Sequence, residues 1–330
     1  MPTRTGRRGA FRYRDARGRV IRAEATLARV EALVIPPAWK DVWISPRPGA
    51  KLQATGYDAA GRKQYLYHPA YRAAQEQEKY DSLIRFGERL PALRVAMAEH
   101  LDRGELDRER VSAVALRLIS LGWFRVGSER YARAGTYGVT TLLRRHVRVR
   151  GRRIELAFRA KGGIQVRTEL VDEELATAIR GLLAVRPGAR VFKYRWEGDL
   201  CNLTSARLND YVKLYLGEEF SAKDFRTWGG TLLAAIYFAE RDRPEADQKA
   251  VVTAVMRQVA NRLGNTPAVC RASYVAPAVV EQYLEGRTIE DFRPRHLRLL
   301  RARDVDLSPE EAATLSLLRS WRIRQARKAA

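Results

Sequence analysis

An asparagine and a tyrosine stand nine residues apart in the stretch NTPAVCRASYV, residues 265–275. Pro267 predicts the start of a short helix that carries Tyr274, because proline fits the first turn of a helix. A tyrosine hydroxyl can attack a phosphodiester and conserve the bond energy in a covalent link, and the amide of Asn265 can donate a hydrogen bond to a phosphoryl oxygen. Two interpretations are therefore open: Tyr274 packs in the core, or it is a nucleophile.

Cationic residues at three other places could hold the phosphate that such a nucleophile attacks. Arg125, in GWFRVGSERY, follows an apolar helix at a turn, and Lys161, in FRAKGG, lies at a hairpin tip. Lys223 and Arg226, in SAKDFRTWGG, share one face of a helix start. Each also has a plain structural interpretation: an arginine that closes a helix C-terminus, a solvated turn lysine, or an exposed basic helix start. As a group they suit phosphate chemistry, because fixed guanidinium groups match the charge of a pentacoordinate phosphoryl transition state.

The composition indicates a polyanionic partner. Lys and Arg number 61 against 38 Asp and Glu, which gives a formal net charge of +23. This excess favours nucleic acid, because neutralised phosphates release their condensed counterions. A membrane is disfavoured, since the longest uncharged apolar run, residues 231–239, has about half the length of a membrane-spanning helix.

The sequence predicts neither a metal site nor a cofactor. Its four His are scattered singly, and Cys201 and Cys270 have no metal-ligand spacing. No carboxylate cluster is apparent that could bind Mg²⁺, so cationic side chains would replace the metal ions that many nucleases use. The N-terminus has no signal-peptide pattern, and with the cysteine usage this favours a cytoplasmic protein.

The texture of the chain predicts an α+β fold, with a small N-terminal β-sheet domain followed by a larger, mainly α-helical domain that contains a three-stranded antiparallel sheet. Residues 1–24 are a basic arm, or in part a strand at FRYRD, and residues 25–75 predict short strands and turns with a hairpin around DAAG. No helical period is visible before residue 70. Residues 76–330 are mainly helical, except for a three-stranded meander at residues 146–170. Helices are expected after Asp107, Asp172, Thr204 and Ser221, and from about residue 245.

The order of these motifs resembles that of type IB DNA topoisomerases of the poxvirus-like bacterial kind, which share their catalytic fold with tyrosine recombinases. FRVGSERY and AKDFRTWGG resemble the segments around the first and second catalytic arginines of that family. NTPAVCRASYV is similar to the segment that carries the tyrosine nucleophile, and RKQYLYH looks like a strand that contacts DNA. The resemblance covers about residues 25–290 and keeps the order and spacing of the motifs.

This resemblance implies a role for each of five residues. Tyr274 would attack a DNA phosphodiester and form a 3′-phosphotyrosyl link, while Arg125, Arg226 and Asn265 would hold the non-bridging oxygens. Lys161 would be the general acid that protonates the departing 5′-oxygen, assisted by Arg125. Many family members have His where this chain has Asn265. Either side chain can donate a hydrogen bond to a phosphoryl oxygen, but an asparagine cannot transfer a proton as a histidine does.

The segment GRKQYLYHPAYR predicts a strand whose side chains point alternately to its two faces. One interpretation is a half-buried strand with its tyrosines in the core. The resemblance implies instead that Gln64, Tyr65 and Tyr67 contact DNA, since glutamine can read adenine and a tyrosine hydroxyl can contact phosphate. The other residues expected to bind the DNA backbone are Tyr131, Thr141 and Lys223.

The sequence thus predicts an enzyme that relaxes supercoiled double-stranded DNA by transient single-strand cleavage and religation, without ATP or metal. It would act as a monomer that clamps the duplex in the bacterial nucleoid. One alternative is a tyrosine recombinase, but those enzymes usually carry His three residues before the second arginine, where this chain has Lys223. The other alternative is a non-catalytic DNA-binding protein, which would leave DNA topology unchanged.

Overall fold

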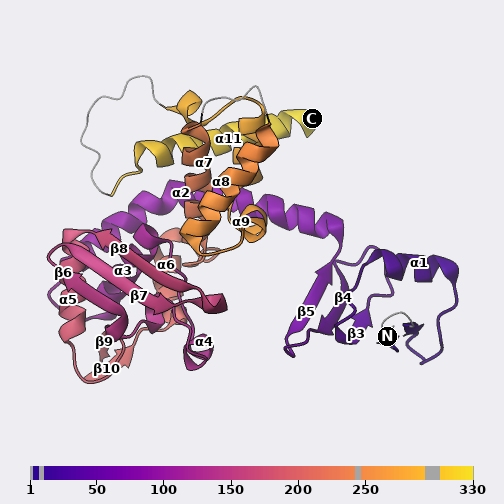
Figure 1. Ribbon diagram of the computed structural model, residues 1–330, viewed down its shortest axis with the longest axis horizontal. Coiled ribbons are helices and arrows are strands. Elements are labelled where there is room, and N and C mark those ends of the chain that lie inside the picture. The colour runs from indigo at the N-terminus through magenta and orange to yellow at the C-terminus, as the bar shows by residue number, and fades with distance from the viewer. Residues whose placement is uncertain (1–2, 7–10, 242–246, 294–304, 330) are drawn as a thin grey trace. The chain divides into compact units, whose positions relative to one another are not determined.

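A computed structural model describes residues 3–6, 11–241, 247–293 and 305–329 (Figure 1). The chain divides into two compact units, residues 1–80 and 81–330. The sequence predicts a domain boundary near residue 75. Residues 1–2 and 7–10 of the expected basic arm lie outside the described residues.

The N-terminal unit is built around a five-stranded antiparallel sheet with the order β2-β1-β3-β4-β5. Its strands are β1 (Thr3–Thr5), β2 (Arg12–Arg14), β3 (Lys40–Ile44), β4 (Leu52–Tyr57) and β5 (Lys63–Tyr67). Strand β2 confirms the strand expected at FRYRD, and β1 pairs with both β2 and β3. Part of the basic N-terminal segment is therefore sheet.

Helix α1 (Glu24–Ala32) packs against this sheet, so the prediction of no helix before residue 70 is wrong. The helix shows almost no apolar period, because only one of its residues, Val30, is buried. Val30 joins Val42, Ile44 and Ala54 in the core of the unit. One buried residue gives too weak a period for a sequence signal, and the Arg29 guanidinium also binds the carbonyl of Ser45.

The hairpin predicted around DAAG is present and joins β4 to β5. The carboxylate of Asp58 accepts hydrogen bonds from the backbone N–H groups of Ala60 and Arg62 and from the Arg62 guanidinium. Gly61 has a φ of +71°, in the left-handed region that favours glycine. This turn fixes the register of β5, the strand expected to contact DNA.

The C-terminal unit contains the predicted three-stranded meander, in the order β6-β7-β8. Its strands are β6 (Val147–Arg150), β7 (Arg153–Arg159) and β8 (Gln165–Val171). Ile154, Leu156 and Phe158 alternate along β7 and are buried, and α5 (Glu173–Ala184) contacts β6 and β7. Another small sheet pairs β9 (Lys193–Trp196) with β10 (Asp199–Asn202).

The rest of this unit is mainly helical, so the predicted fold class is confirmed. The other α-helices described here are α2 (Pro69–Leu101, which begins in the N-terminal unit), α3 (Arg108–Gly122), α4 (Glu129–Arg133), α6 (Ser205–Leu216), α7 (Asp224–Ala239), α8 (Gln248–Leu263), α9 (Pro267–Ser273), α10 (Pro277–Leu284) and α11 (Pro309–Ala329). The short 3₁₀ helices are η1 (Val139–Thr141), η2 (Arg144–His146), η3 (Lys161–Gly163) and η4 (Ile289–Phe292).

The predicted helix starts follow from side-chain caps. Asp107, Asp172 and Thr204 each accept a hydrogen bond from the backbone N–H three residues on, which opens α3, α5 and α6. Ser221 is not a cap of this kind: its hydroxyl donates to the carboxylate of Asp224, and α7 begins only at Asp224. Helix α3 buries most of its middle turns and contacts α5, α6 and α7, so it lies at the centre of the unit.

A buried carboxylate ties the C-terminal helix to α7. Glu311 of α11 accepts hydrogen bonds from Arg94 of α2 at 2.7 and 2.9 Å, from Ser308 at 2.9 Å and from the indole N–H of Trp228 of α7 at 3.2 Å. Burial by itself would raise the pKa of Glu311, but the hydrogen bonds and charge of Arg94, with those of Ser308 and Trp228, outweigh it and lower the pKa.

This network makes a prediction for stability. We expect Glu311→Gln to lower the free energy of unfolding by about 1–3 kcal/mol at neutral pH, because hydrogen bonds to a charged group are lost. Since the folded state lowers the pKa of Glu311, its contribution is complete above the ordinary value of 4.5 and is lost as the pH falls through the folded value. Urea titrations should show that the difference in stability between the two proteins shrinks as the pH falls below about 4.5. Glu310→Gln, at a more exposed neighbour, is the control; an equal loss there would contradict the assignment.

Candidate active site

Tyr274 lies at the C-terminal end of α9. The helix begins at Pro267, as predicted, and Thr266 caps it by accepting a hydrogen bond from the N–H of Val269. Tyr274 is the residue just after the helix, with a φ of −127°, and its backbone N–H donates to the carbonyl of Cys270 at 2.9 Å. The side chain is half-buried. The tyrosine is therefore neither a core residue nor a freely exposed one.

Arg226 lies in the first turn of α7 and is only 4% exposed, so an exposed basic helix start is the wrong interpretation for it. Its guanidinium donates to the carbonyl of Trp123 and, at 2.8 Å, to the carbonyl of Leu263. The guanidinium carbon lies 5.1 Å from the ring centroid of Tyr274. Burial lowers the pKa of Arg226, the charge of Arg125 lowers it further, and Tyr274 acts in the opposite direction.

Arg125 approaches the same place from the segment after α3. Trp123 ends α3 in the left-handed conformation, with a φ of +54°, and turns the chain so that Arg125 meets the end of α8. The Arg125 guanidinium donates to the side-chain oxygen of Asn265 at 2.5 Å and to the carbonyl of Gly264 at 3.1 Å. The structure thus joins Arg125 directly to Asn265, although 140 residues separate them in sequence.

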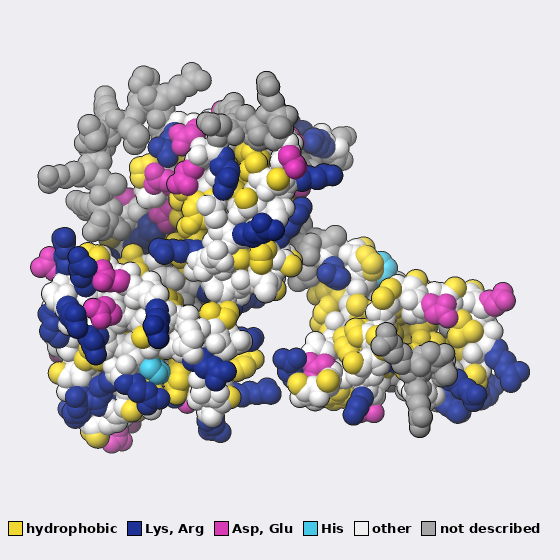
Figure 2. Space-filling model, in the orientation of Figure 1, with side chains coloured by type: hydrophobic (Ala, Val, Ile, Leu, Met, Phe, Trp, Pro, Cys, Tyr) yellow, Lys and Arg dark blue, Asp and Glu magenta, His cyan; other side chains and the backbone are white. Residues whose placement is uncertain are grey.

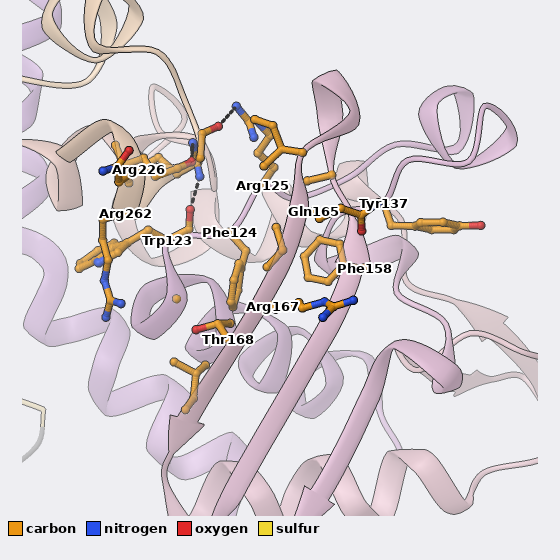
Figure 3. Close-up of a pocket in the computed structure, with 18 residues that line it drawn as sticks. Trp123, Phe124, Arg125, Tyr137, Phe158, Gln165, Arg167, Thr168, Arg226 and Arg262 are labelled. Carbon is orange, nitrogen blue, oxygen red and sulfur yellow. Dashed lines mark hydrogen bonds between the residues drawn. The ribbon is translucent and has the colours of Figure 1, made fainter. Parts of the chain in front are cut away.

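Both arginines line one pocket, together with residues of the β7–β8 hairpin such as Arg167 and Thr168 (Figure 3). They bind consecutive carbonyls, those of Leu263 and Gly264, at the C-terminal end of α8. The two guanidinium groups are therefore fixed by backbone atoms before any ligand is present, which is the arrangement that stabilises developing negative charge most strongly.

Two buried donors of this site have no hydrogen-bond partner in the structure: Nδ2 of Asn265 and Nε of Arg226. A buried donor without a partner costs about 1–3 kcal/mol, so a ligand that accepts from these two donors would gain from the contact. The partner that these two donors would suit is an acceptor with several negatively charged oxygens. A phosphate has this character.

Lys161 lies at the tip of the β7–β8 hairpin, as predicted, in η3. Gly162 and Gly163 have φ values of +81° and +80°, so the turn needs both glycines. The lysine is exposed, and its ammonium lies 5.1 Å from the ring centroid of Tyr131, which is 40% exposed. Lys161 and Tyr131 are therefore neighbours, a pairing that the sequence does not indicate.

The other residues expected to contact the DNA backbone lie in different environments. Lys223 is exposed at the N-terminal end of α7 and is free to face a ligand in solvent. Thr141 is only 1% exposed, and its hydroxyl accepts from the N–H of Gly138 at 2.9 Å and donates to its carbonyl at 3.0 Å. The Thr141 hydroxyl is thus occupied at η1, and its contact with the DNA backbone stays a prediction.

In the N-terminal unit, Tyr65 and Tyr67 are 50% and 39% exposed, so core packing is the wrong interpretation for them. Their rings stack with centroids 6.3 Å apart, and the ammonium of Lys63 lies 5.8 Å from the Tyr65 centroid. Gln64 points to the opposite, half-buried face of β5, where its amide donates to Asp58 at 2.8 Å. Gln64 therefore does not share a face with the two tyrosines.

Lys and Arg side chains are spread over the visible surface of both units (Figure 2). Within the described ranges, no group of three or more His, Cys, Asp and Glu side chains could hold a metal ion. No helix in the described part of the chain is long and apolar enough to cross a membrane.

Comparison with known protein families shows which family the chain belongs to. Residues 68–293 match the catalytic core of eukaryotic DNA topoisomerase I, and residues 10–58 match the N-terminal domain of bacterial DNA topoisomerase IB. The chain belongs to the type IB DNA topoisomerase family. The resemblance seen in the order of the sequence motifs is thereby confirmed.

Viral members of the type IB family are similar to this chain over most of its length. DNA topoisomerase 1B of Acanthamoeba polyphaga mimivirus is 31% identical over 268 residues, which cover 78% of this chain and 80% of the relative. DNA topoisomerase 1B of vaccinia virus (strain Copenhagen) is 20% identical over 235 residues, 70% of this chain and 72% of the relative. DNA topoisomerase I of monkeypox virus gives the same values.

Some candidate residues of this type IB enzyme lie inside the ranges that match the two family models, and others lie outside them. All five candidate catalytic residues lie in the range that matches the catalytic core. Gln64, Tyr65 and Tyr67 fall between the two matched ranges, and α11 lies beyond both. The matched ranges assign no role to single residues, so the catalytic and DNA-contacting assignments both stay predictions.

The sequence does not reveal the backbone carbonyls that bind Arg125 and Arg226, because every residue type has a carbonyl. The signal of Gly229 and Gly230, in the middle of α7, was also missed. Glycine inside a helix is unfavourable, so two in succession signal a close packing contact. A Cβ on Gly229 would overlap the ring of Trp123, whose carbonyl binds Arg226.

Proposed function

We propose that this type IB enzyme relaxes supercoiled duplex DNA by transient cleavage and religation of one strand, through a 3′-phosphotyrosyl intermediate on Tyr274. The phenolic oxygen attacks the phosphorus, the bond to the 5′-oxygen breaks, and the phenolic proton passes to water. Lys161 supplies the proton that the departing 5′-oxygen takes up. In religation the 5′-hydroxyl attacks the phosphotyrosyl phosphorus and returns its proton to Lys161. The bond to the Tyr274 oxygen breaks, and that oxygen takes up a proton from water.

The observation that carries this proposal is the convergence of Arg125, Arg226 and Asn265 on the surroundings of Tyr274. The Arg226 guanidinium lies 5.1 Å from the tyrosine ring, and Arg125 is bound to Asn265. The unpartnered Nδ2 of Asn265 and Nε of Arg226 are donors that non-bridging phosphate oxygens would satisfy. A phosphate held by the Arg226 guanidinium would lie near the Tyr274 ring, and the reaction needs the phenolic oxygen to meet its phosphorus.

Neither ATP nor a metal is required by this chemistry. The phosphotyrosyl link conserves the energy of the broken bond, so resealing needs no external energy source. Two fixed guanidinium groups stabilise the charge that a metal ion stabilises in other phosphoryl-transfer enzymes. Lys161 takes part in this scheme as a mobile donor at a glycine-containing tip, held over the Tyr131 ring until DNA is bound.

We propose further that the protein acts as a monomer on double-stranded DNA in the bacterial cytoplasm. The net charge of +23 supports binding to the phosphate backbone. The exposed faces of Tyr65 and Tyr67, next to Lys63, suit contacts with sugar and phosphate. Gln64, on the other face of β5, would have to leave Asp58 before it could read a base edge.

Plasmid relaxation tests the proposal. The wild type, incubated with negatively or positively supercoiled plasmid in excess EDTA and without ATP, should relax both. A protein that retards DNA in a gel but leaves both plasmids supercoiled would be a binding protein, and the proposal would be wrong. A requirement for a divalent cation would refute the metal-independent mechanism.

Arg226→Lys should show whether the reaction rate depends on the hydrogen-bond geometry of the guanidinium or only on its positive charge. A lysine keeps one positive charge but cannot donate to Trp123, Leu263 and a phosphate together, because it lacks the planar fork of a guanidinium. We expect the rate of covalent adduct formation at saturating DNA to fall by about 10²–10³-fold. Lys substitution at the exposed Arg271 of α9 is the matched control and should leave the rate nearly unchanged.

A further inference from the structure

Gly230 of α7 lies against the backbone of Tyr274. A Cβ at position 230 would be 2.6 Å from the carbonyl oxygen of Tyr274 and 3.0 Å from its Cβ. Real Cβ atoms are not found at the shorter of these distances, and the nearer atom belongs to the backbone, which cannot swing aside as a side chain can. Any residue larger than glycine would therefore displace the segment that carries Tyr274.

The next residue of α7 holds the same segment by hydrogen bonds. Thr231 is fully buried, and its hydroxyl donates to the carbonyl of Tyr274 at 3.3 Å and accepts from the N–H of Ala276 at 3.1 Å. The hydroxyl thus bridges the two backbone groups on either side of Val275. Because α9 ends before Tyr274, this bridge replaces the hydrogen bonds that a helix would supply.

We propose that Gly230 and Thr231 form a seat on α7 that positions Tyr274 for attack on the phosphate. Arg226 lies on the same helix, four residues before Gly230, so one rigid element sets the distance between the phosphate-binding guanidinium and the tyrosine. This inference rests on the proposed role of Tyr274 as nucleophile. Gly230 and Thr231 touch neither substrate nor reacting atoms, so they are positioning residues.

The seat predicts a loss of reaction rate without a loss of DNA affinity. In Gly230→Ala, we expect the single-turnover rate of covalent adduct formation at saturating DNA to fall by about 10–10²-fold, since a displacement of about 1 Å is enough for such a loss. The dissociation constant for DNA should stay within about twofold. Gly181→Ala is the matched control, because Gly181 lies within α5 and a Cβ there meets nothing within 4 Å.

Thr231 gives an independent test if Gly230→Ala fails to fold. Thr231→Val keeps the shape of the side chain but removes the hydroxyl, and we expect a rate about tenfold lower. Thr231→Ser restores the hydroxyl and should recover most of the rate, which a purely space-filling role would not predict. Equal rates in the Val and Ser variants, or a rate loss that is matched by a loss of DNA affinity, would overturn the seat.

The same assay separates failure of this inference from failure of the proposed function. If the wild type forms no covalent adduct, Tyr274 is not a nucleophile and the proposed function itself fails. If the wild type forms the adduct and Gly230→Ala forms it as fast as Gly181→Ala does, the proposed function stands and the seat is wrong.

Discussion

Tyr274→Phe should abolish relaxation and covalent adduct formation, with a loss of about 10⁴-fold or more, because removal of a nucleophile takes away the chemical step itself. DNA binding should be kept. The substitution removes one oxygen and leaves the ring that lies 5.1 Å from the Arg226 guanidinium, so the surroundings of the site are not disturbed. Relaxation of supercoiled plasmid, DNA retardation in gels and detection of adduct after denaturation measure these effects.

Tyr237→Phe is the matched control for this variant. Tyr237 lies on α7 and is half-buried, as Tyr274 is, but it takes no part in the proposed chemistry. We expect its rate to stay near that of the wild type. Mass spectrometry of the digested wild-type adduct should find the nucleotide on the peptide that contains Tyr274. A nucleotide on another tyrosine, or residual adduct in Tyr274→Phe, would show that the nucleophile was assigned wrongly.

Most of the local structure could be predicted, because its signals are local. The meander follows from alternating residues such as Ile154, Leu156 and Phe158 between glycine turns, and Asp107 caps α3 as its position suggests. Helix α1 was missed because it buries only Val30. An element can be predicted when the residues that stabilise it lie close together in the sequence and form a recognisable pattern.

The environment of the site residues was harder to predict than their identity. The spacing of Lys223 and Arg226 indicates one solvated helix face, yet Arg226 is buried. Burial is possible because the carbonyls of Trp123 and Leu263 accept hydrogen bonds from its guanidinium. Those partners lie 103 and 37 residues away in sequence. Thr141 is a second example: its hydroxyl could bind a phosphate, but in the structure it forms hydrogen bonds with the backbone of Gly138. Tertiary contacts of this kind have no signature in residue type or spacing.

Lys161→Arg carries the second large expected effect. An arginine keeps the positive charge at the hairpin tip, but a guanidinium does not release a proton near neutral pH, so the departing 5′-oxygen would leave without a general acid. We expect the cleavage rate at saturating DNA to fall by about 10²–10⁴-fold. The fold should tolerate the change, because Lys161 is exposed and its ammonium lies over the face of Tyr131, a place that a guanidinium can also take.

The identity of the leaving group distinguishes proton donation by Lys161 from simple charge stabilisation. A substrate with sulfur in place of the scissile 5′-oxygen releases a thiolate, which is far less basic than an alkoxide and needs no proton donor. The Lys161→Arg variant should therefore cleave this substrate at close to the wild-type rate. Lys213→Arg, at a half-buried lysine of α6 that pairs with Glu218, should match the wild type on both substrates. If Lys161→Arg stays equally slow on the sulfur substrate, Lys161 acts through its position or charge, and the general acid must be another residue. Arg125 is then the first candidate, because it lines the same pocket as Arg226, the arginine next to the Tyr274 ring.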